Sequence, residues 1–426
     1  MTKIISKMKK KKGLFDFILL ASGSMLGQGM AILFAPILSR IYTEEQMGTY
    51  TLILTAVGMF ESAICLRYDL ILVSEKNENK IKSIAFSCFR ITLLLSLIVT
   101  LVYTVYLLIT DQLPISKMWL GLFVFPALMC GGIILILTAL NNRNREYKNI
   151  ASSSLAQGFV HNGLSTVLGL THIFGAIGLI IGRLAGYIAY ILLASRTEAV
   201  RSIKNNELLN KTERLIILKE NKKQALFSTP AVIISCFSYS IINLFLSQLY
   251  GKSTLGIYSY SYRLLGLPLT VISANISRMF FKDASVEYQG RKNMRHSFFK
   301  MLVPILCISI VMVFCFEMFA PSLFAFFLGD RWREAGVFVQ ILAPMYGIRL
   351  LSNSFSNATI VTGKQFVSLI VQILYLIAAA LVFFICKINS LGVYSFLKIM
   401  NILFCVIYAI YFFVLATMCL RTEKGD

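Results

Sequence analysis

The sequence predicts an all-α polytopic membrane protein with about twelve transmembrane helices in two six-helix bundles. Of its 426 residues, 57% are hydrophobic and only 14% are charged, whereas soluble domains carry about 25% charged residues. The mean hydropathy is +0.74. A helix needs roughly 20 apolar residues to cross the hydrocarbon, and the chain is almost a succession of such runs. This leaves no room for a soluble catalytic domain.

Polar or charged stretches separate the apolar runs and delimit the predicted helices. The first half holds six, over residues 14–38, 48–73, 83–109, 117–140, 150–170 and 173–195. The second half holds six more, over residues 226–249, 254–281, 300–327, 335–361, 365–386 and 390–418. The basic start, residues 1–12, leads into a full-length apolar run without a small-residue cleavage site. We therefore expect a retained first helix rather than a signal peptide.

The distribution of lysine and arginine predicts the orientation. With a cytoplasmic N-terminus, 28 of the 41 lie on the cytoplasmic side, 6 in the outside turns and 7 within helices. This asymmetry follows the positive-inside rule and predicts that both termini are cytoplasmic. It also explains most of the net charge of +21, which we attribute to topology and anionic lipid contact rather than to nucleic acid binding.

An internal repeat predicts that the two sets of helices are related. Five residues near the first interhelical turn recur 208 positions later, as Leu38/Leu246, Ser39/Ser247, Tyr42/Tyr250, Gly48/Gly256 and Tyr50/Tyr258. We expect an amino-terminal bundle at 1–195, a cytoplasmic linker loop at 196–224 and a carboxy-terminal bundle at 225–426. Both copies would start in the cytoplasm, so they would be parallel repeats with a site between them.

Metal, disulfide and nucleotide sites have little support. The nine cysteines are scattered singly, without paired spacing. Gly-Lys-Ser at 251–253 resembles the end of a phosphate-binding loop, but Leu246 occupies the position of the first glycine. His161 and His172 have no metal-ligand spacing. We therefore expect no metal, no cofactor and no nucleotide motor.

Seven cations lie within the predicted helices, where only three acids could neutralise them. The cations are Arg67, Arg90, Arg183, Arg263, Arg278, Arg349 and Lys398, and the acids are Glu61, Asp69 and Glu317. A charge at the bilayer centre costs roughly 2.5–3.5 kcal/mol, so the deep ones must face protein or water. The surplus predicts a cavity of net positive charge and an anionic substrate.

The cations differ in their expected depth. Arg67, Arg278 and Arg90 lie near the cytoplasmic boundary, where snorkelling to the interface is an alternative to a role in the cavity. The other four lie deeper, and we expect them to face the cavity. Arg183 follows Gly182 in a run of glycines at four-residue spacing, which predicts a close helix contact beside it.

The acids leave the driving force open. Glu61 lies roughly mid-membrane and is either an arginine partner or a site for an ion or proton, and Asp69 and Glu317 are further candidates for such coupling. Coupling to Na⁺, coupling to H⁺ and the membrane potential are all alternatives. Moving one charge through 100 mV is worth about 2.3 kcal/mol, so the potential alone could bias the export of an anion.

Several segments, in order along the chain, carry a family resemblance. They are Gln28-Gly29, Leu38-Ser39-Arg40-Ile41-Tyr42, Met47-Gly48-Thr49-Tyr50, Leu66-Arg67-Tyr68-Asp69-Leu70, Tyr262-Arg263-Leu264-Leu265-Gly266-Leu267-Pro268-Leu269, Leu328-Gly329-Asp330-Arg331-Trp332, Ala335-Gly336, Gln340-Ile341-Leu342-Ala343-Pro344 and Gly363-Lys364-Gln365. With these segments the chain resembles the Wzx-type oligosaccharide-repeat flippases. These are polysaccharide biosynthesis proteins of the multidrug/oligosaccharidyl-lipid/polysaccharide (MOP) exporter superfamily. Ser74-Glu75-Lys76 departs from the apolar-proline ending of the family's second helix.

The resemblance implies a MATE-like fold with a central cationic cavity, in the bacterial cytoplasmic (inner) membrane. It implies alternating access that carries an undecaprenyl-pyrophosphate-linked oligosaccharide of O-antigen or capsule to the outer leaflet, without enzymatic activity. The implied partners are membrane lipids and other polysaccharide assembly proteins, and we expect a monomer. The candidate substrate-binding residues are Arg40, Arg67, Arg183, Arg263, Arg278, Arg349 and Lys398. Arg67 and Arg263 match arginines within the family's segments.

Three alternatives stay open. A drug/cation antiporter of the same superfamily would expose uncompensated acids in its cavity. A lipid II flippase would share the cationic cavity but have about fourteen helices. A membrane-embedded polysaccharide polymerase or acyltransferase would need a sizeable outside loop, or a catalytic histidine clustered with an acid.

Overall fold

The computed structural model describes residues 27, 29–75, 77–204, 207–222, 224–291 and 293–421. These residues form helices joined by short turns, and they include no β-strand. Eight of the described helices are long and apolar enough to cross a membrane. The prediction of an all-α polytopic membrane protein is thereby confirmed. The chain divides into two compact units between Cys236 and Phe237.

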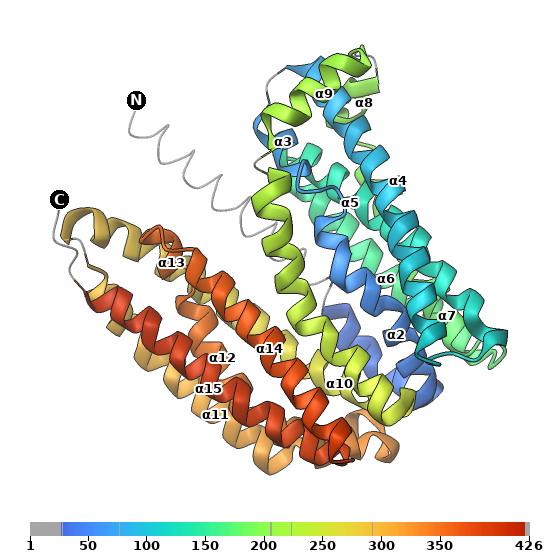
Figure 1. Cartoon of the computed structure of the whole chain (residues 1–426), viewed down its shortest axis with the longest axis vertical. Coiled ribbons are helices and arrows are strands. Elements are labelled where there is room, and N and C mark those ends of the chain that lie inside the picture. The colour runs from blue at the N-terminus through green and yellow to red at the C-terminus, as the bar shows by residue number, and fades with distance from the viewer. Residues whose placement is uncertain are drawn as a thin grey trace. The chain divides into compact units, whose positions relative to one another are not determined.

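The first unit consists of long helices with two short helices at one end (Figure 1). A helix at Gly29–Ile41 precedes α2 (Glu44–Phe60), and residues 14–26 and 28 of the predicted first helix lie outside the described residues. The later helices are α4 (Glu78–Ile109), α5 (Val124–Arg143), which follows the 3-10 segment η2 (Ile115–Phe123), α6 (Tyr147–Leu170) and α7 (Ala176–Ala194). α6 packs along α7, and α5 contacts both α4 and α7.

The second predicted helix, 48–73, is not continuous, which corrects that prediction. α2 ends at Phe60, the 3-10 turn η1 covers Glu61–Ala63, and α3 covers only Asp69–Ser74. Between them, Leu66 and Arg67 adopt left-handed backbone conformations with φ values of 50° and 59°. The break could not be predicted from composition, because residues 59–74 contain neither proline nor glycine and remain largely apolar.

The predicted linker loop, 196–224, contains two short helices. α8 (Glu198–Lys204) and α9 (Lys211–Glu220) lie beside α3 and the start of α4 (Figure 1). The Leu209 N–H donates to the Ser83 hydroxyl at 3.0 Å, and the Tyr68 hydroxyl donates to the Leu218 carbonyl at 3.2 Å. These bonds attach the end of the linker to the first unit. The Glu213 carboxylate, which accepts from the backbone N–H three residues earlier at 3.0 Å, supports the start of α9.

The second unit begins within α10 (Thr229–Arg291), which is interrupted at Gly251 with φ 81° and ψ 177°. This interruption separates the predicted helices 226–249 and 254–281. α11 (Arg295–Leu328), α12 (Arg333–Phe355), α14 (Phe366–Ile388) and α15 (Val393–Leu420) follow, with the short α13 (Ala358–Val361) after α12. The predicted helix 335–361 is therefore divided. α12 contacts both α11 and α15 and is the most buried apolar helix of this unit.

The repeated residues serve similar structural roles in the two units. The Tyr42 hydroxyl donates to the Ser165 carbonyl on α6 at 2.7 Å, and the Tyr250 hydroxyl donates to the Leu391 carbonyl between α14 and α15 at 2.9 Å. Each tyrosine follows the first helix of its half, and each bond reaches the fifth helix of that half or the turn that follows it. In both halves, the repeated tyrosine therefore attaches the turn after the first helix to the last two helices by a hydrogen bond.

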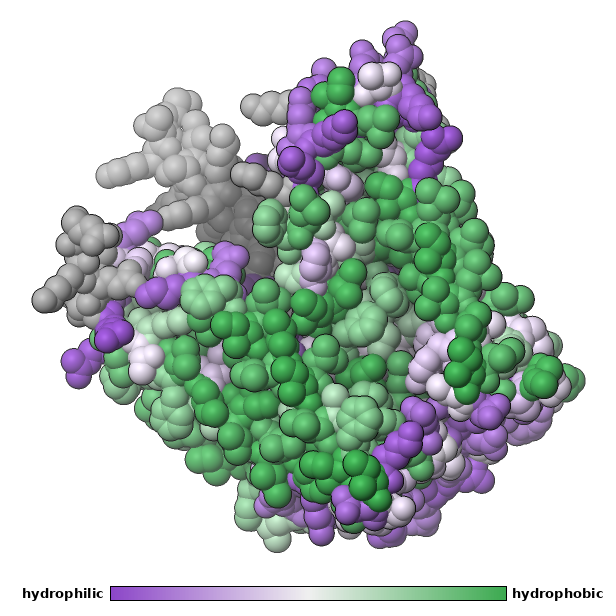
Figure 2. Space-filling view, viewed as in Figure 1, coloured by the Kyte–Doolittle hydropathy of each residue, from purple (hydrophilic) through white to green (hydrophobic). Residues whose placement is uncertain are grey.

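The surface of the first unit has the pattern expected of a membrane protein (Figure 2). Hydrophilic side chains gather over α8 and α9 at one end and again at the opposite end, with a hydrophobic band between them. α4 contributes a run of exposed apolar side chains, including Leu94, Leu97, Leu101 and Val102 at 61%, 49%, 56% and 64% exposure. A continuous run of exposed apolar side chains is typical of a helix that faces lipid.

Candidate functional site

The break in the second span places an arginine in strained backbone, with an acid two residues later at the start of α3. Two consecutive left-handed non-glycine residues cost about 1–2 kcal/mol each. Arg67 is half-buried; one terminal nitrogen lies 3.5 Å from the Ser62 carbonyl, and its Nε is buried without a hydrogen-bond partner. Asp69 is buried and interacts electrostatically with Arg67. Such strain persists where the surroundings enforce it and is typical of functional segments.

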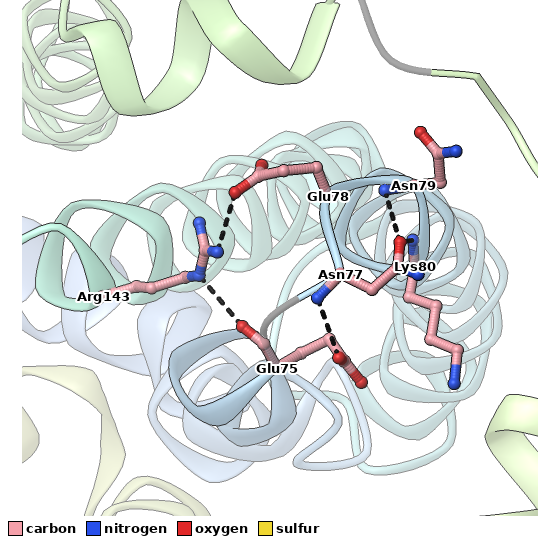
Figure 3. Close-up of polar contacts among 6 residues, drawn as sticks. All are labelled: Glu75, Asn77, Glu78, Asn79, Lys80 and Arg143. Carbon is pink, nitrogen blue, oxygen red and sulfur yellow. Dashed lines mark hydrogen bonds and ion pairs between the residues drawn. The ribbon is translucent and has the colours of Figure 1, made fainter.

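The carboxy-terminal end of this broken span is held by polar contacts (Figure 3). Arg143, the last residue of α5, donates from Nε to the Glu75 carbonyl at 3.1 Å and pairs with Glu78 at 2.8 Å. The Asn77 side chain accepts from the backbone N–H groups of Asn79 and Lys80 at 3.0 and 3.3 Å, which caps α4. Glu75, Asn77 and Glu78 thus stand where the family has an apolar-proline ending, and they are held by the α4 cap and by Arg143 of α5.

The Glu61 cluster (Tyr50, Glu61, His161, Arg183 and Tyr187) lies within the first unit. The Tyr187 hydroxyl donates to Glu61 Oε1 at 2.9 Å and accepts from Arg183 at 3.0 Å. The Arg183 guanidinium also lies over the Tyr187 ring, 4.6 Å from its centroid. Tyr50 and His161 share a hydrogen bond of 3.2 Å, and Tyr50 is within electrostatic reach of Arg183. Glu61 is therefore linked to an arginine through a tyrosine.

Glycines allow the helices of this cluster to approach closely. A Cβ at Gly131 on α5 would lie 2.7 Å from Cγ of Glu61. A Cβ at Gly182 would lie 2.8 Å from the His161 carbonyl, and one at Gly186 would lie 2.7 Å from the Gln157 carbonyl. The close contact expected beside Arg183 is confirmed, because α6 packs on the glycine face of α7.

The Arg349 cluster (Tyr239, Tyr346, Arg349, Tyr375 and Tyr408) lies within the second unit. The guanidinium carbon of Arg349 is 4.4 Å from the Tyr239 ring centroid, 5.5 Å from that of Tyr346 and 6.0 Å from that of Tyr408. Tyr375 lies against Tyr408 with centroids 4.6 Å apart. A guanidinium over aromatic faces is stabilised by the ring quadrupole.

Arg263 lies on a face of α10 whose other residues are mostly small or polar. It is half-buried, and Ser259, Thr270, Ala274 and Ser277 follow the same helical stripe. In the described part of the chain Arg263 forms no ion pair or hydrogen bond. A stripe of this composition is not suited to lipid contact, so it is compatible with a wet surface.

The remaining predicted site residues have exposed side chains. They are Arg40, Arg278, Glu317 and Lys398. Lys398 shares a face of α15 with Ile402, Val406 and Ile410, which are 61%, 51% and 57% exposed. This apolar stripe is typical of lipid contact, and a lysine near the start of a helix can snorkel to the interface. A role of Lys398 in the cavity stays a prediction, and the position of Lys398 among lipid-facing residues does not favour it.

The sequence predicted the charged groups of the two clusters but not their tyrosines. Tyr187 and Tyr346 could have been found, because they lie four and three residues from Arg183 and Arg349 on the same helices. Tyr239, Tyr375 and Tyr408 lie on other helices, so no local spacing connects them with Arg349.

Comparison with known protein families shows which family the chain belongs to. A family profile described as "Polysaccharide biosynthesis protein" matches residues 37–337. The chain belongs to this polysaccharide biosynthesis protein family. The match includes the broken second span, the Glu61 cluster and Arg263, whereas Arg349 and Lys398 lie beyond it.

A curated relative also matches this polysaccharide biosynthesis protein over part of its length. The relative is an "Uncharacterized membrane protein in cps region" of Klebsiella pneumoniae, 26% identical over 228 residues. The aligned region covers 49% of the chain and 47% of the relative, so the match spans about half the length of each.

Solved structures show how widely the fold of this polysaccharide biosynthesis protein is shared. A lipid II flippase, MurJ, in an inward closed conformation aligns with a TM-score of 0.71 at 15% identity, covering 94% of this chain and 87% of that one. An inward-facing multidrug resistance MATE family transporter of the MOP superfamily aligns with a TM-score of 0.60 at 18% identity, covering 94% of both chains. The protein therefore has the fold of MOP-superfamily transporters, as the resemblance implied.

Proposed function

We propose that this protein is a flippase for a lipid-linked oligosaccharide. It carries an undecaprenyl-pyrophosphate-linked repeat unit from the cytoplasmic to the outer leaflet of the bacterial cytoplasmic membrane. The family supports a role in polysaccharide biosynthesis, and the fold supports transport rather than catalysis. The observation that carries the proposal is the surplus of arginine in apolar helices. Arg67 and Arg263 are half-buried, and neither forms an ion pair within the described residues.

The arginines would bind the pyrophosphate. A guanidinium presents forked N–H donors that match phosphate oxygens, and its charge persists at every physiological pH. The broken second span would hold Arg67 at a fixed position, and the polar stripe of α10 would keep Arg263 in contact with water. The polyprenyl tail would stay in lipid while the glycan occupies the wet cavity. We expect a monomer that works among membrane lipids beside other polysaccharide assembly proteins.

The described helices support twelve crossings, an even number that would leave both termini on one side of the membrane. The distribution of lysine and arginine favours the cytoplasm as that side. Dividing α10 at Gly251 adds one crossing to the eight apolar helices. The helix at Gly29–Ile41, α2 together with α3, and α6 supply three more. Each half of the chain would then contribute six helices.

The membrane potential would drive export. Each negative charge moved outward through 100 mV releases about 2.3 kcal/mol. The hydrogen bond between Glu61 and Tyr187, with Arg183 on the same hydroxyl, supports Glu61 as an arginine partner rather than as a Na⁺ or H⁺ site. The same contacts weigh against a drug/cation antiporter, which would need an uncompensated acid.

Replacement of Arg263 tests the proposal. Cells without the protein should accumulate lipid-linked repeat units in the inner leaflet, and the wild-type gene should relieve this accumulation. Arg263→Ala should insert normally and fail to relieve it. Arg90→Ala is the matched control, because Arg90 is an exposed arginine on α4, over the Phe86 ring. Full relief by Arg263→Ala would overturn the assignment.

A further inference from the structure

The second unit contains a buried charge with aromatic rather than acidic surroundings. Arg349 is 9% exposed, and Tyr346, Tyr375 and Tyr408 are each 1% exposed. The tyrosines of this cluster come from four helices, α10, α12, α14 and α15. A cation held in this way by four separate helices is part of the packed interior of the unit.

The acids of the described second unit do not balance this charge. Two of them form ion pairs, Asp283 with Lys300 and Asp330 with Arg333. Two accept hydrogen bonds from hydroxyl groups, Glu287 from Ser297 and Glu334 from Tyr394. The fifth, Glu317, is exposed. Cation–π contacts recover only part of the cost of burying a charge in an apolar layer. Arg349 therefore keeps a net positive charge that no acid among the described residues of the second unit neutralises.

Hydrogen-bond donors in the cluster also remain unused. The Nε–H of Arg349 is buried without a partner, and so is the Tyr346 hydroxyl. Arginine has no acceptor atom, so its free N–H can be satisfied only by an acceptor. The Tyr239 and Tyr408 hydroxyls, 3.5 Å apart, can turn to donate as well. A buried cation ringed by O–H donors has the chemistry of an anion site.

We propose that the Arg349 cluster binds a small inorganic anion, with chloride as the representative ligand. The anion would accept from the Arg349 N–H and from the Tyr346 hydroxyl. The rings lie only 4.4 to 6.0 Å from the guanidinium carbon, which favours a monatomic ion over a bulky one. This site lies within the second unit and does not depend on the identity of the transported lipid.

Thermal unfolding of the purified full-length protein tests the proposal. Unfolding is followed in detergent while sodium chloride or sodium bromide replaces sodium gluconate at constant ionic strength. Chloride and bromide should raise the unfolding temperature of the wild type saturably, because a ligand that binds only the folded state stabilises it. Bromide should also give an anomalous diffraction peak beside Arg349. A wild-type protein that unfolds at the same temperature in all three salts would overturn the proposal.

Two variants separate anion binding from a purely structural cation–π cluster. Tyr346→Phe keeps the ring and removes the hydroxyl, so the apparent affinity for chloride should fall by about tenfold or more. Arg349→Met should abolish the chloride effect; if it fails to fold, Tyr346→Phe still decides. Tyr394→Phe is the control, because its hydroxyl donates to Glu334, which lies outside the cluster. An unchanged chloride titration in Tyr346→Phe would show that the tyrosines serve only as packing.

Discussion

The Tyr187 hydroxyl joins the two charged groups of the Glu61 cluster, so its removal should be costly. Tyr187→Phe keeps the ring under Arg183 but removes the donor 2.9 Å from Glu61 and the acceptor 3.0 Å from Arg183. A hydrogen bond to a charged group contributes about 1.5–3 kcal/mol, so the two hydrogen bonds together contribute at most about 6 kcal/mol. Glu61 and Arg183 still attract each other without the hydroxyl. We therefore expect the free energy of unfolding to fall by about 2–4 kcal/mol.

A double-mutant cycle with Glu61→Gln measures the bridge directly. Tyr187→Phe removes the donor of this hydrogen bond and Glu61→Gln removes the charge of its acceptor, so their effects should depart from additivity by about 1–2 kcal/mol. Unfolding of the wild type, the two single variants and the double variant is measured by SDS titration in mixed micelles. Tyr190→Phe is the control on the same helix, because its hydroxyl bonds the neutral Thr138 at 2.8 Å and should be additive with Glu61→Gln. Additivity of Tyr187→Phe and Glu61→Gln within about 0.5 kcal/mol would refute the bridge.

Three further substitutions test the packing, the cap and the strained break by thermal unfolding. Gly182→Ala puts a Cβ 2.8 Å from a backbone carbonyl of α6 and should lower the free energy of unfolding by about 1–3 kcal/mol. Gly163→Ala is the control, because a Cβ there has nothing within 4 Å; it should leave the free energy of unfolding unchanged or raise it by about 1 kcal/mol. Equal effects would contradict the close α6–α7 contact. Asn77→Ala should cost about 1 kcal/mol by removing the α4 cap, and no loss would mean that the cap is dispensable. Leu66→Gly should raise the free energy of unfolding by about 1 kcal/mol, because glycine relieves the left-handed strain. If that strain positions Arg67, flipping should fall in the same variant. A less stable variant would show that the contacts of the Leu66 side chain outweigh the strain.

The sequence allowed the fold class to be predicted because hydropathy reports helices directly when the solvent is lipid. α4 and α11 start five residues before the prediction, and the other bounds of α4, α11, α14 and α15 lie within three residues of it. The break after Phe60 was not predictable in the same way. It depends on tertiary contacts such as that between Cys65 and Thr92 on α4, with the two side chains 3.3 Å apart.

From the sequence, only the charged members of the two clusters could be selected, and their part in a functional site stays a prediction. Buried ions stand out in an apolar sequence because each is expensive, so Glu61, Arg183 and Arg349 could be selected by type alone. What surrounds each ion depends on helix packing. The hydroxyl that links Glu61 to Arg183 and the rings that surround Arg349 are tyrosines, which are common in membrane helices and carry no charge to mark them.

The Glu61 cluster lies where the helices are least apolar, and this association has a physical cause. α6 has 24 residues, enough to cross a bilayer, yet it is not among the eight described helices that are apolar enough to do so. Its composition is polar because Asn162 and Ser165 face the interior of the first unit, at 4% and 0% exposure, near the Tyr50–His161 contact. Polar side chains within the hydrocarbon need a protein shell, and the glycine face of α7 supplies one. The low hydropathy of α6 therefore reflects polar contacts inside the first unit.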